Sequence, residues 1–275
     1  MFVDFHVHTS ASDGSFAPTE VIKMATDKGI EVLSITDHDT VEGVQEISGV
    51  EGIVFVPGVE ISSEYPRTLH ILGYAIDPFH EKLCAVLKDL QEFRKKRNLL
   101  IVEKMNQMGF HITLEELIKE AGGGLVGRLH FASLMVKKGF VSNYQEAFDR
   151  YLGKGKPLYI DKKRLQPDEA IGLILAAGGI PVLAHPYQAE EDEEKLEDLV
   201  KKLAGFGLKG IEVFYSKHNE RRISKYLELA KKYDLLVTAG TDFHGENKPD
   251  IPLGISVQYY YLREFLSEIE GRCVL

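Results

Sequence analysis

The residues of this sequence that are best suited to metal binding or catalysis are histidines and acids, which lie where strand-like segments end. His6 and His8 lie two residues apart in an alternating segment, so both side chains project from one face of the expected strand. Asp242 and His244 repeat this spacing far along the chain. Imidazoles and carboxylates are ligands of divalent transition metals. The pattern therefore predicts a metal site.

Further candidates follow or lie within other strand-like segments. The expected strands cover residues 2–8, 32–36, 53–56, 69–74, 180–184, 210–214 and 235–239. The additional candidate ligands are Asp13, His38, Glu60, His70 and His185. A single histidine in a strand is more often a packing residue, but a structural core would not collect so many polar groups that are costly to bury. The whole set therefore favours a metal centre.

The elements that must position these residues are βα units. Residues 1 to about 80 alternate strand-like and helix-like stretches with short connections, which is typical of a mainly parallel sheet. This rhythm stops between about 81 and 160, where a long amphipathic helix carries Arg94 to Arg97 on its expected solvent side. The sequence predicts an α/β fold, with a βα barrel formed by residues 1–80 and 161–275 and a helical insert at 81–160. In such a barrel, side chains at the C-terminal strand ends converge on one mouth.

Composition limits the classes of function. The chain has 275 residues and a net charge of −9, which argues against broad binding of long nucleic acid but allows a phosphorylated substrate. We expect a cytoplasmic protein that does not associate with a membrane, because no apolar run approaches the length of a bilayer span. Cys84 and Cys273 are expected to be reduced thiols. The sequence does not indicate an oligomeric state.

Several short motifs occur in order along the chain. They are His6-Val7-His8-Thr9, Ser12-Asp13-Gly14, Thr36-Asp37-His38-Asp39, Pro57-Gly58-Val59-Glu60, His185-Pro186 and Gly240-Thr241-Asp242-Phe243-His244-Gly245. Together they resemble the polymerase and histidinol phosphatase (PHP) superfamily of metal-dependent phosphoesterases. This resemblance implies a distorted seven-stranded βα barrel with three divalent metal ions, of which Mn, Fe and Zn all suit the ligand types.

The resemblance also implies a division of the ligands. His6, His8, Glu60 and Asp242 would hold one metal, Glu60 would bridge to a second metal held by His70 and His185, and Asp13, His38 and His244 would hold the third. Glu60 and Asp242 are therefore the expected catalytic residues. A hydroxide bridging two of the metals would attack phosphorus in line. Asp37 and Asp39 either orient His38 or are acids at a helix N-terminus.

The helical insert holds the candidate residues for substrate binding. Arg128 suits phosphate recognition and lies with His130 at the start of an expected helix. With the downstream segment 147–152, this region resembles the PHP subgroup of 3′,5′-nucleotide bisphosphate phosphatases and 5′-to-3′ oligoribonucleases. The resemblance implies that Arg128 and His130 grip a substrate phosphate from a lid over the barrel mouth. His218 is a further substrate-binding candidate, although an ordinary loop position explains it equally well.

Other basic or glycine-rich segments have weaker interpretations. Residues 162–164 are Lys-Lys-Arg, which could steer phosphates but are more commonly a solvated stretch. The triple glycine at 122–124 is more consistent with a joint between helices than with a phosphate loop, because no Lys-Ser/Thr pair follows it.

The sequence therefore predicts a phosphoesterase that hydrolyses a phosphate monoester of a small nucleotide or short oligonucleotide. Histidinol-phosphate phosphatase is the alternative with the same metal site. An amidohydrolase-like C–N hydrolase and a non-catalytic metal-binding module are less favoured.

Overall fold

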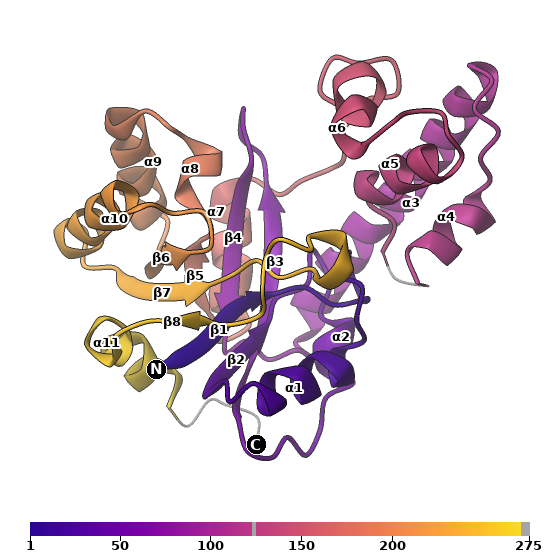
Figure 1. Ribbon diagram of the computed structural model, residues 1–275. Helices are drawn as coiled ribbons and strands as arrows, with labels where there is room; N and C mark the ends of the chain where they lie inside the picture. Colours follow the sequence, from indigo (N-terminus) through magenta and orange to yellow (C-terminus); the bar gives the residue numbers. More distant parts are fainter. Residues whose placement is uncertain (123–124, 271–275) are drawn as a thin grey trace.

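Seven strands follow one another around a barrel-like sheet, and a short eighth strand is added beside the first. The computed structural model describes residues 1–122 and 125–270, so Gly123, Gly124 and Cys273 lie outside it. Within this part the sheet order is β7-β6-β5-β4-β3-β2-β1-β8. The strands are β1 (Phe2–Val7), β2 (Val32–Ile35), β3 (Val54–Ser63), β4 (Leu69–Tyr74), β5 (Ile180–Leu183), β6 (Gly210–Tyr215), β7 (Leu236–Gly240) and β8 (Ile255–Ser256) (Figure 1).

The barrel is distorted by the direction of β4. Strands β1, β2 and β3 are parallel to one another, as are β5, β6 and β7, but β4 is antiparallel to both β3 and β5. Strand β1 also lies beside the segment that follows β7, through a bridge between Val7 and Phe243. The predicted βα barrel is thus confirmed, with the antiparallel pair β1–β8 as an addition. The sequence indicated the position of β4 but not its direction.

Strand β3 is longer than the sequence pattern suggested. It continues through Pro57 and Gly58 to Ser63, so Glu60 lies inside a strand and not after one. Gly58 is needed there because a Cβ atom would lie 2.5 Å from Oγ of Ser34 on the neighbouring strand. The extended half of β3 pairs with β4, and Ser62 lies opposite His70.

Helices connect the strands and cover the sheet (Figure 1). They are α1 (Pro18–Asp27), α2 (Glu42–Gln45), α7 (Pro167–Ala176), α8 (Pro186–Ala189), α9 (Glu193–Gly205), α10 (Glu220–Lys232) and α11 (Tyr259–Ile269). A 3₁₀ turn, η2 (Gly245–Asn247), lies in the connection between β7 and β8. Among the described residues, no helix combines the length and the apolar character required to cross a bilayer.

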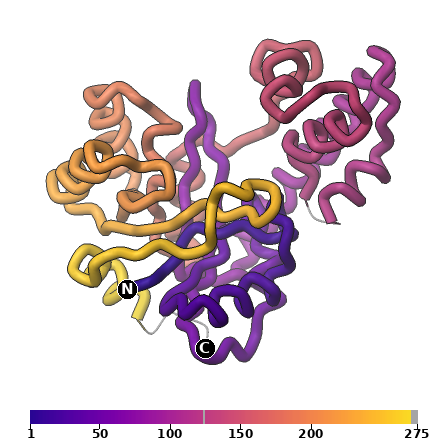
Figure 2. The backbone as a smooth tube through the Cα atoms, in the orientation of Figure 1, coloured from indigo at the N-terminus to yellow at the C-terminus, as the bar shows by residue number. Residues whose placement is uncertain are grey.

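The insert is a group of helices set beside the barrel. It comprises α3 (Glu81–Gln107), α4 (Leu114–Glu120), α5 (Arg128–Lys137), α6 (Tyr144–Ala147) and a π-helix, η1 (Phe148–Leu152). These helices share a separate hydrophobic cluster that runs from Ile101 to Leu158. The first half of α3 packs instead on the barrel through Leu83, Leu87 and Leu90. Figure 2 shows the chain leaving the barrel along α3 and returning by one extended segment.

One prediction about α3 is wrong. Arg94 and Arg97 were expected on the solvent side, but their exposed fractions are only 7% and 6%. The intervening residues 95 and 96 are exposed, as expected. The two arginines lie on the buried stripe of the helix, between Leu90 and Ile101, because the spacings of three and four residues continue through them. They therefore face the space between the insert and the barrel.

Candidate metal centre

All nine predicted ligands converge at one end of the barrel. Most of them come from the C-terminal ends of parallel strands or the loops that follow, as the barrel rule requires. His70 lies at the start of β4, yet it reaches the same end because β4 runs in the opposite direction. The nine residues are His6, His8, Asp13, His38, Glu60, His70, His185, Asp242 and His244.

Glu60 lies at the centre of this cluster. Its side chain is fully buried, and its Oε1 is 2.8 Å from Nδ1 of His70 and 3.0 Å from Nε2 of His185. Its Oε2 is 2.8 Å from Nδ1 of His38. The remaining imidazoles around it are those of His6 and His8, at 3.4 and 3.3 Å. Burial opposes ionisation of Glu60, but the histidines hold its pKa well below the usual range, so it is a carboxylate.

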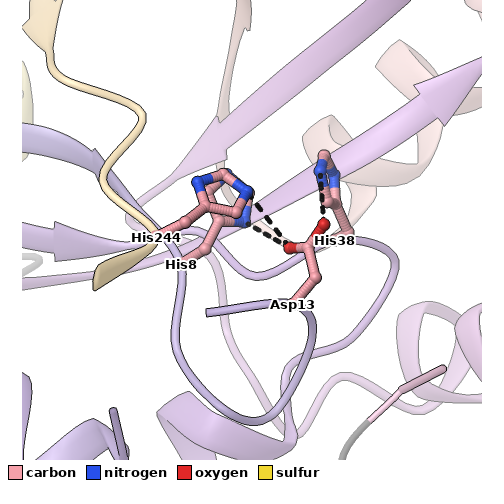
Figure 3. Close-up of side chains that lie close together, drawn as sticks. All are labelled: His8, Asp13, His38 and His244. Atoms are coloured by element: carbon pink, nitrogen blue, oxygen red, sulfur yellow. Dashed lines mark ion pairs between the residues drawn. The ribbon is translucent and has the colours of Figure 1, made fainter. Parts of the chain in front are cut away.

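A second group of side chains surrounds Asp13. Its Oδ1 is 3.2 Å from Nε2 of His244 and 3.8 Å from Nδ1 of His8, and its Oδ2 is 3.9 Å from Nε2 of His38 (Figure 3). These four residues offer ligand atoms that lie within 4.8 Å of one another. His38 therefore stands between the two carboxylates, with one ring nitrogen toward Glu60 and the other toward Asp13.

Asp242 joins the two groups. Its Oδ1 lies 3.2 Å from Nε2 of His8 and 3.3 Å from Nδ1 of His244. Its Oδ2 accepts hydrogen bonds from the Tyr215 hydroxyl at 2.9 Å and the Lys248 ammonium at 2.8 Å. Asp242 has a φ of 61° and His185 a φ of 25°, which are strained values for residues other than glycine. Such strain is concentrated at functional sites.

The cluster contains buried nitrogen atoms without partners. Nε2 of His6 and both ring nitrogens of His8 have no hydrogen-bond partner among the described residues, although they are inaccessible to solvent. Unpaired buried polar atoms are costly, and bound cations would satisfy them. Two further ligand groups, His6–His8–Glu60 and His38–Glu60–His70, have metal-binding spacing. The donor set therefore fits divalent metals, while the division into three sites stays a prediction.

Acids behind the candidate ligands form hydrogen bonds that hold the ligands in place. One of these acids, Glu212, is not predicted by the sequence analysis. Glu212, in the middle of β6, is fully buried and contacts both His6 and His185. A charged residue inside an otherwise apolar strand was the available signal. Asp37 accepts hydrogen bonds from Thr9 and Ser12, and so positions the loop that carries Asp13.

Asp39 belongs to a different network from the one expected. It accepts hydrogen bonds from the backbone N–H of Ser62 and from the side chains of Arg94 and Lys162. Neither Asp37 nor Asp39 has a hydrogen bond with His38 among the described residues. Asp39 therefore links the edge of the ligand cluster to Arg94 of the insert and to Lys162, which follows the insert.

A cavity of about 250 Å³ opens beside the ligands Asp13, His38 and His70. Its other wall is strongly basic. The cationic side chains that line it are Arg67, Arg94, Arg97, Arg128, Lys162 and Arg164. We call this space the cationic cavity. Of residues 162–164, expected to be solvated, positions 162 and 164 thus contribute to it.

Arg97 is one of the cations in this cavity whose charge is not compensated by a carboxylate of the described residues. Its guanidinium donates to Oδ1 of Asn98 at 2.6 Å, and it has no ion pair with a carboxylate in the part of the chain that the structure describes. Burial lowers its pKa to about 9, and the neighbouring charges of Arg94 and Arg128 add to the effect. A buried cation without a counter-ion is destabilising, so the cavity is suited to an anion.

The three predicted substrate residues have different surroundings. Arg128 lines the cationic cavity and donates to the backbone oxygen of Leu152 at 3.3 Å. His130 is buried, and its Nδ1 accepts from the N–H of Gly127 at 3.0 Å. His218 is not brought to the cavity, because its Nδ1 donates to the backbone oxygen of Val213 and its ring packs on Tyr215. Their contacts with substrate stay predictions.

Comparison with known proteins shows the family of this chain. The family model described as "PHP domain" matches residues 4–213. The chain belongs to the PHP family. A 5′-3′ exoribonuclease of Haemophilus influenzae is 35% identical over 245 residues, which cover 88% of this chain and 89% of the relative. A 3′,5′-nucleoside bisphosphate phosphatase of Chromobacterium violaceum is 33% identical over 263 residues, or 90% of each chain.

A solved structure shares the complete PHP fold. It is described as an amidohydrolase from Chromobacterium violaceum with bound sulfate and no metal. It aligns with a TM-score of 0.88 at 31% identity, covering 98% of this chain and 96% of that chain. The protein is thus an enzyme, a metal-dependent phosphoesterase of the PHP family.

Proposed function

We propose that this PHP phosphoesterase removes a phosphate from a nucleotide that carries a second phosphate, such as a nucleoside 3′,5′-bisphosphate, or acts on a short oligonucleotide. The observation that carries the proposal is the cationic cavity next to the metal cluster. One phosphate would lie at the metal ligands and another at the arginines of the cavity. The protein would act in the cytoplasm.

The nine clustered residues would hold three divalent metals in the overlapping sets expected from the PHP resemblance. Bound metals supply a water of lowered pKa and neutralise charge on phosphate oxygens. The protein residues supply the geometry: Glu60 would connect two of the sets, and Asp242 would be held by Tyr215 and Lys248. Lys248 keeps a positive charge beside the cluster, because burial is outweighed by Asp242, which raises its pKa.

The second phosphate is favoured by the charge of the cavity. Arg94 and Lys162 are already paired with Asp39, so one carboxylate is shared between two cations. Arg97 and Arg128 have no carboxylate partner among the described residues. A phosphate dianion would compensate these charges, and guanidinium groups bind phosphate oxygens with good geometry. A substrate with a single phosphate would leave this cavity uncompensated.

Known relatives support the same substrate class. The Haemophilus protein is named as an exoribonuclease and the Chromobacterium protein as a phosphatase of nucleoside bisphosphates. Histidinol-phosphate phosphatase remains the alternative, since it would use the same metal ligands with a substrate that has one phosphate. An amide hydrolase and a non-catalytic metal-binding module are the remaining alternatives.

A phosphate-release assay with added Mn²⁺ tests the proposal. We expect adenosine 3′,5′-bisphosphate to give a kcat/KM at least ~10-fold higher than adenosine 3′-monophosphate or histidinol phosphate, because a second phosphate adds charge-assisted hydrogen bonds. Preference for histidinol phosphate would select the alternative enzyme. A metal-loaded protein that releases no phosphate from any of the three, and cleaves no short oligonucleotide, would contradict the proposal.

A further inference from the structure

A second cavity, of about 500 Å³, continues from the cationic cavity between the barrel and the insert. Arg67, Arg128, Phe148 and Arg164 line both spaces, so the two are contiguous. Aromatic rings contribute to the lining of this second space, together with charged side chains. These rings belong to Tyr65, Phe148, Tyr159 and Tyr187. We call this second space the aromatic groove.

The four rings come from separate parts of the fold. Tyr65 lies between β3 and β4, Tyr187 in α8, and Tyr159 in the segment that leads back from the insert. All four are half-buried, so their rings are not enclosed in a core. Barrel and insert thus each contribute aromatic surface to the same groove.

Two details indicate a site built for a flat ligand. Phe148 is the first residue of η1, a π-helix, and such helices are rare and frequently found at functional sites. The guanidinium of Arg128 lies over the ring of Tyr159, 5.2 Å from its centroid. Arg128 also lines the cationic cavity. One side chain therefore joins a planar stack to the phosphate-binding surface.

We propose that the aromatic groove binds the nucleobase of the substrate by stacking, while the cationic cavity binds its second phosphate. This inference rests on the proposed function and adds the part of the molecule that distinguishes a nucleotide from other bisphosphates. In a nucleotide only the ribose separates the base from the phosphate. The aromatic groove and the cationic cavity are likewise adjacent, since they share lining residues. Aromatic rings beside basic residues are the usual platform for bases, because every base has a π-face.

The acids in the groove do not oppose this assignment. Asp161 lies 2.7 Å and Glu64 3.4 Å from Nη1 of Arg164, so both carboxylates are engaged. Arg67 is paired in turn with Glu191 at 2.9 Å. Arg128 remains without a carboxylate partner in the described chain and is available to a base or a phosphate.

The test compares two substrates that differ only in the base: adenosine 3′,5′-bisphosphate and ribose 3,5-bisphosphate. Wild-type enzyme is expected to prefer the nucleotide by about 10-fold or more in kcat/KM, which is within the range of one base stack. Tyr65→Ala should reduce kcat/KM for the nucleotide by about 10-fold and leave that for the abasic substrate unchanged. Phe148→Ala should reduce kcat/KM more for the nucleotide than for the abasic substrate, because Phe148 also lines the cationic cavity. Tyr144→Ala, which removes an exposed ring elsewhere on the insert, is the control.

Each outcome decides the matter. Equal turnover of the two substrates by wild type, or equal losses on both in Phe148→Ala and Tyr65→Ala, would overturn the base site and leave the proposed function intact. If neither bisphosphate is hydrolysed, the proposed function fails. Calorimetric binding of adenosine 3′,5′-bisphosphate to metal-free protein then tests the groove alone: weaker binding in Phe148→Ala but not Tyr144→Ala supports it, and unchanged binding in Phe148→Ala and Tyr65→Ala rejects it.

Discussion

Nδ1 of His6 donates a hydrogen bond to Oε1 of Glu212 at 2.9 Å, deep in the barrel. The other oxygen of the same carboxylate accepts from the backbone N–H of His185 at 2.6 Å. One acid therefore holds two predicted metal ligands from different strands. It directs Nε2 of His6 toward the cluster and secures the strained backbone of His185.

Glu212→Gln should weaken metal binding by about 10- to 100-fold, which is typical when an orienting partner is lost. A glutamine side chain has only one acceptor oxygen, and its NH2 group would face one of the two N–H donors, so both hydrogen bonds cannot be kept in this arrangement. Metal content is measured by mass spectrometry after dialysis against a fixed free-metal concentration. Glu228→Gln, at an exposed position of α10, is the matched control. Unchanged metal content in Glu212→Gln would assign this carboxylate a purely structural role.

Glu60→Gln should lose activity and one or both of the metals that Glu60 is expected to bridge. The amide is neutral and can bring only one oxygen to the cluster, whereas the carboxylate faces imidazoles with both oxygens. Phosphate release and metal content are measured together, and circular dichroism shows whether the variant is folded. A variant with full metal content and full turnover would refute the assignment of Glu60.

Arg97→Met should raise KM for adenosine 3′,5′-bisphosphate by about 10-fold or more and change KM for adenosine 3′-monophosphate little, because Arg97 is assigned to the second phosphate. The free energy of unfolding should stay the same or increase, since the change removes a buried cation without a carboxylate partner. Lys96→Met, at an exposed position one residue earlier, is the control. Equal effects on both substrates would exclude a specific contact.

Arg128→Ala should raise KM for a phosphomonoester substrate far more than it lowers metal content. Arg128 lines the cavity but is not among the nine clustered residues, so its loss should leave the metal ligands in place. Steady-state kinetics and metal analysis of the same preparation make the comparison. An unchanged KM would remove Arg128 from the substrate site.

Lys162 should give substrate binding a dependence on pH. Burial lowers its pKa to about 7; Asp39 opposes this shift, whereas Arg94 and Arg164 add to it. Below this pH the side chain is a cation that attracts phosphate, and above it the charge is lost. KM for the bisphosphate should therefore rise as pH increases through about 7. Lys162→Arg should remove this rise, because arginine stays protonated; the same rise in that variant would assign it to another group.

The convergence of the nine candidate ligands could be predicted from the sequence because their chemistry and position point the same way. Each candidate combines an imidazole or carboxylate with a strand end, and the barrel rule needs only the order of strands to bring them together. The position of His70 at the site does not follow from the hydrophobic pattern of its strand. Periodicity locates a strand but does not state its direction, and only the antiparallel course of β4 places its first residues at the mouth.

The charged residues around the cationic cavity and behind the candidate ligands were harder to predict from the sequence. Arg94 and Arg97 were assigned to solvent because their charge suggested it, although their spacing from Leu90 and Ile101 placed them on the buried stripe. Glu212 has the alternation of a strand residue, and only its charge inside the apolar strand β6 indicates a role at the site. For Arg94 and Arg97 the position in the helix predicts burial and the charge does not, whereas for Glu212 the charge is the informative property; in both cases the sequence does not show which charged groups share a cavity.

The reversed course of β4 has a consequence for the substrate side of the site. Because β4 ends at the barrel end opposite the metal cluster, the chain needs a long element to return to the mouth, and α3 supplies 27 residues, or about 40 Å. The length of this helix and its rotation about its axis determine where Arg94, Arg97 and the rest of the insert lie relative to the barrel. The ligands up to His70 precede it, and His185 and the later ones follow the insert. Additions or deletions between them would therefore change the substrate side of the site and leave the candidate ligands in place.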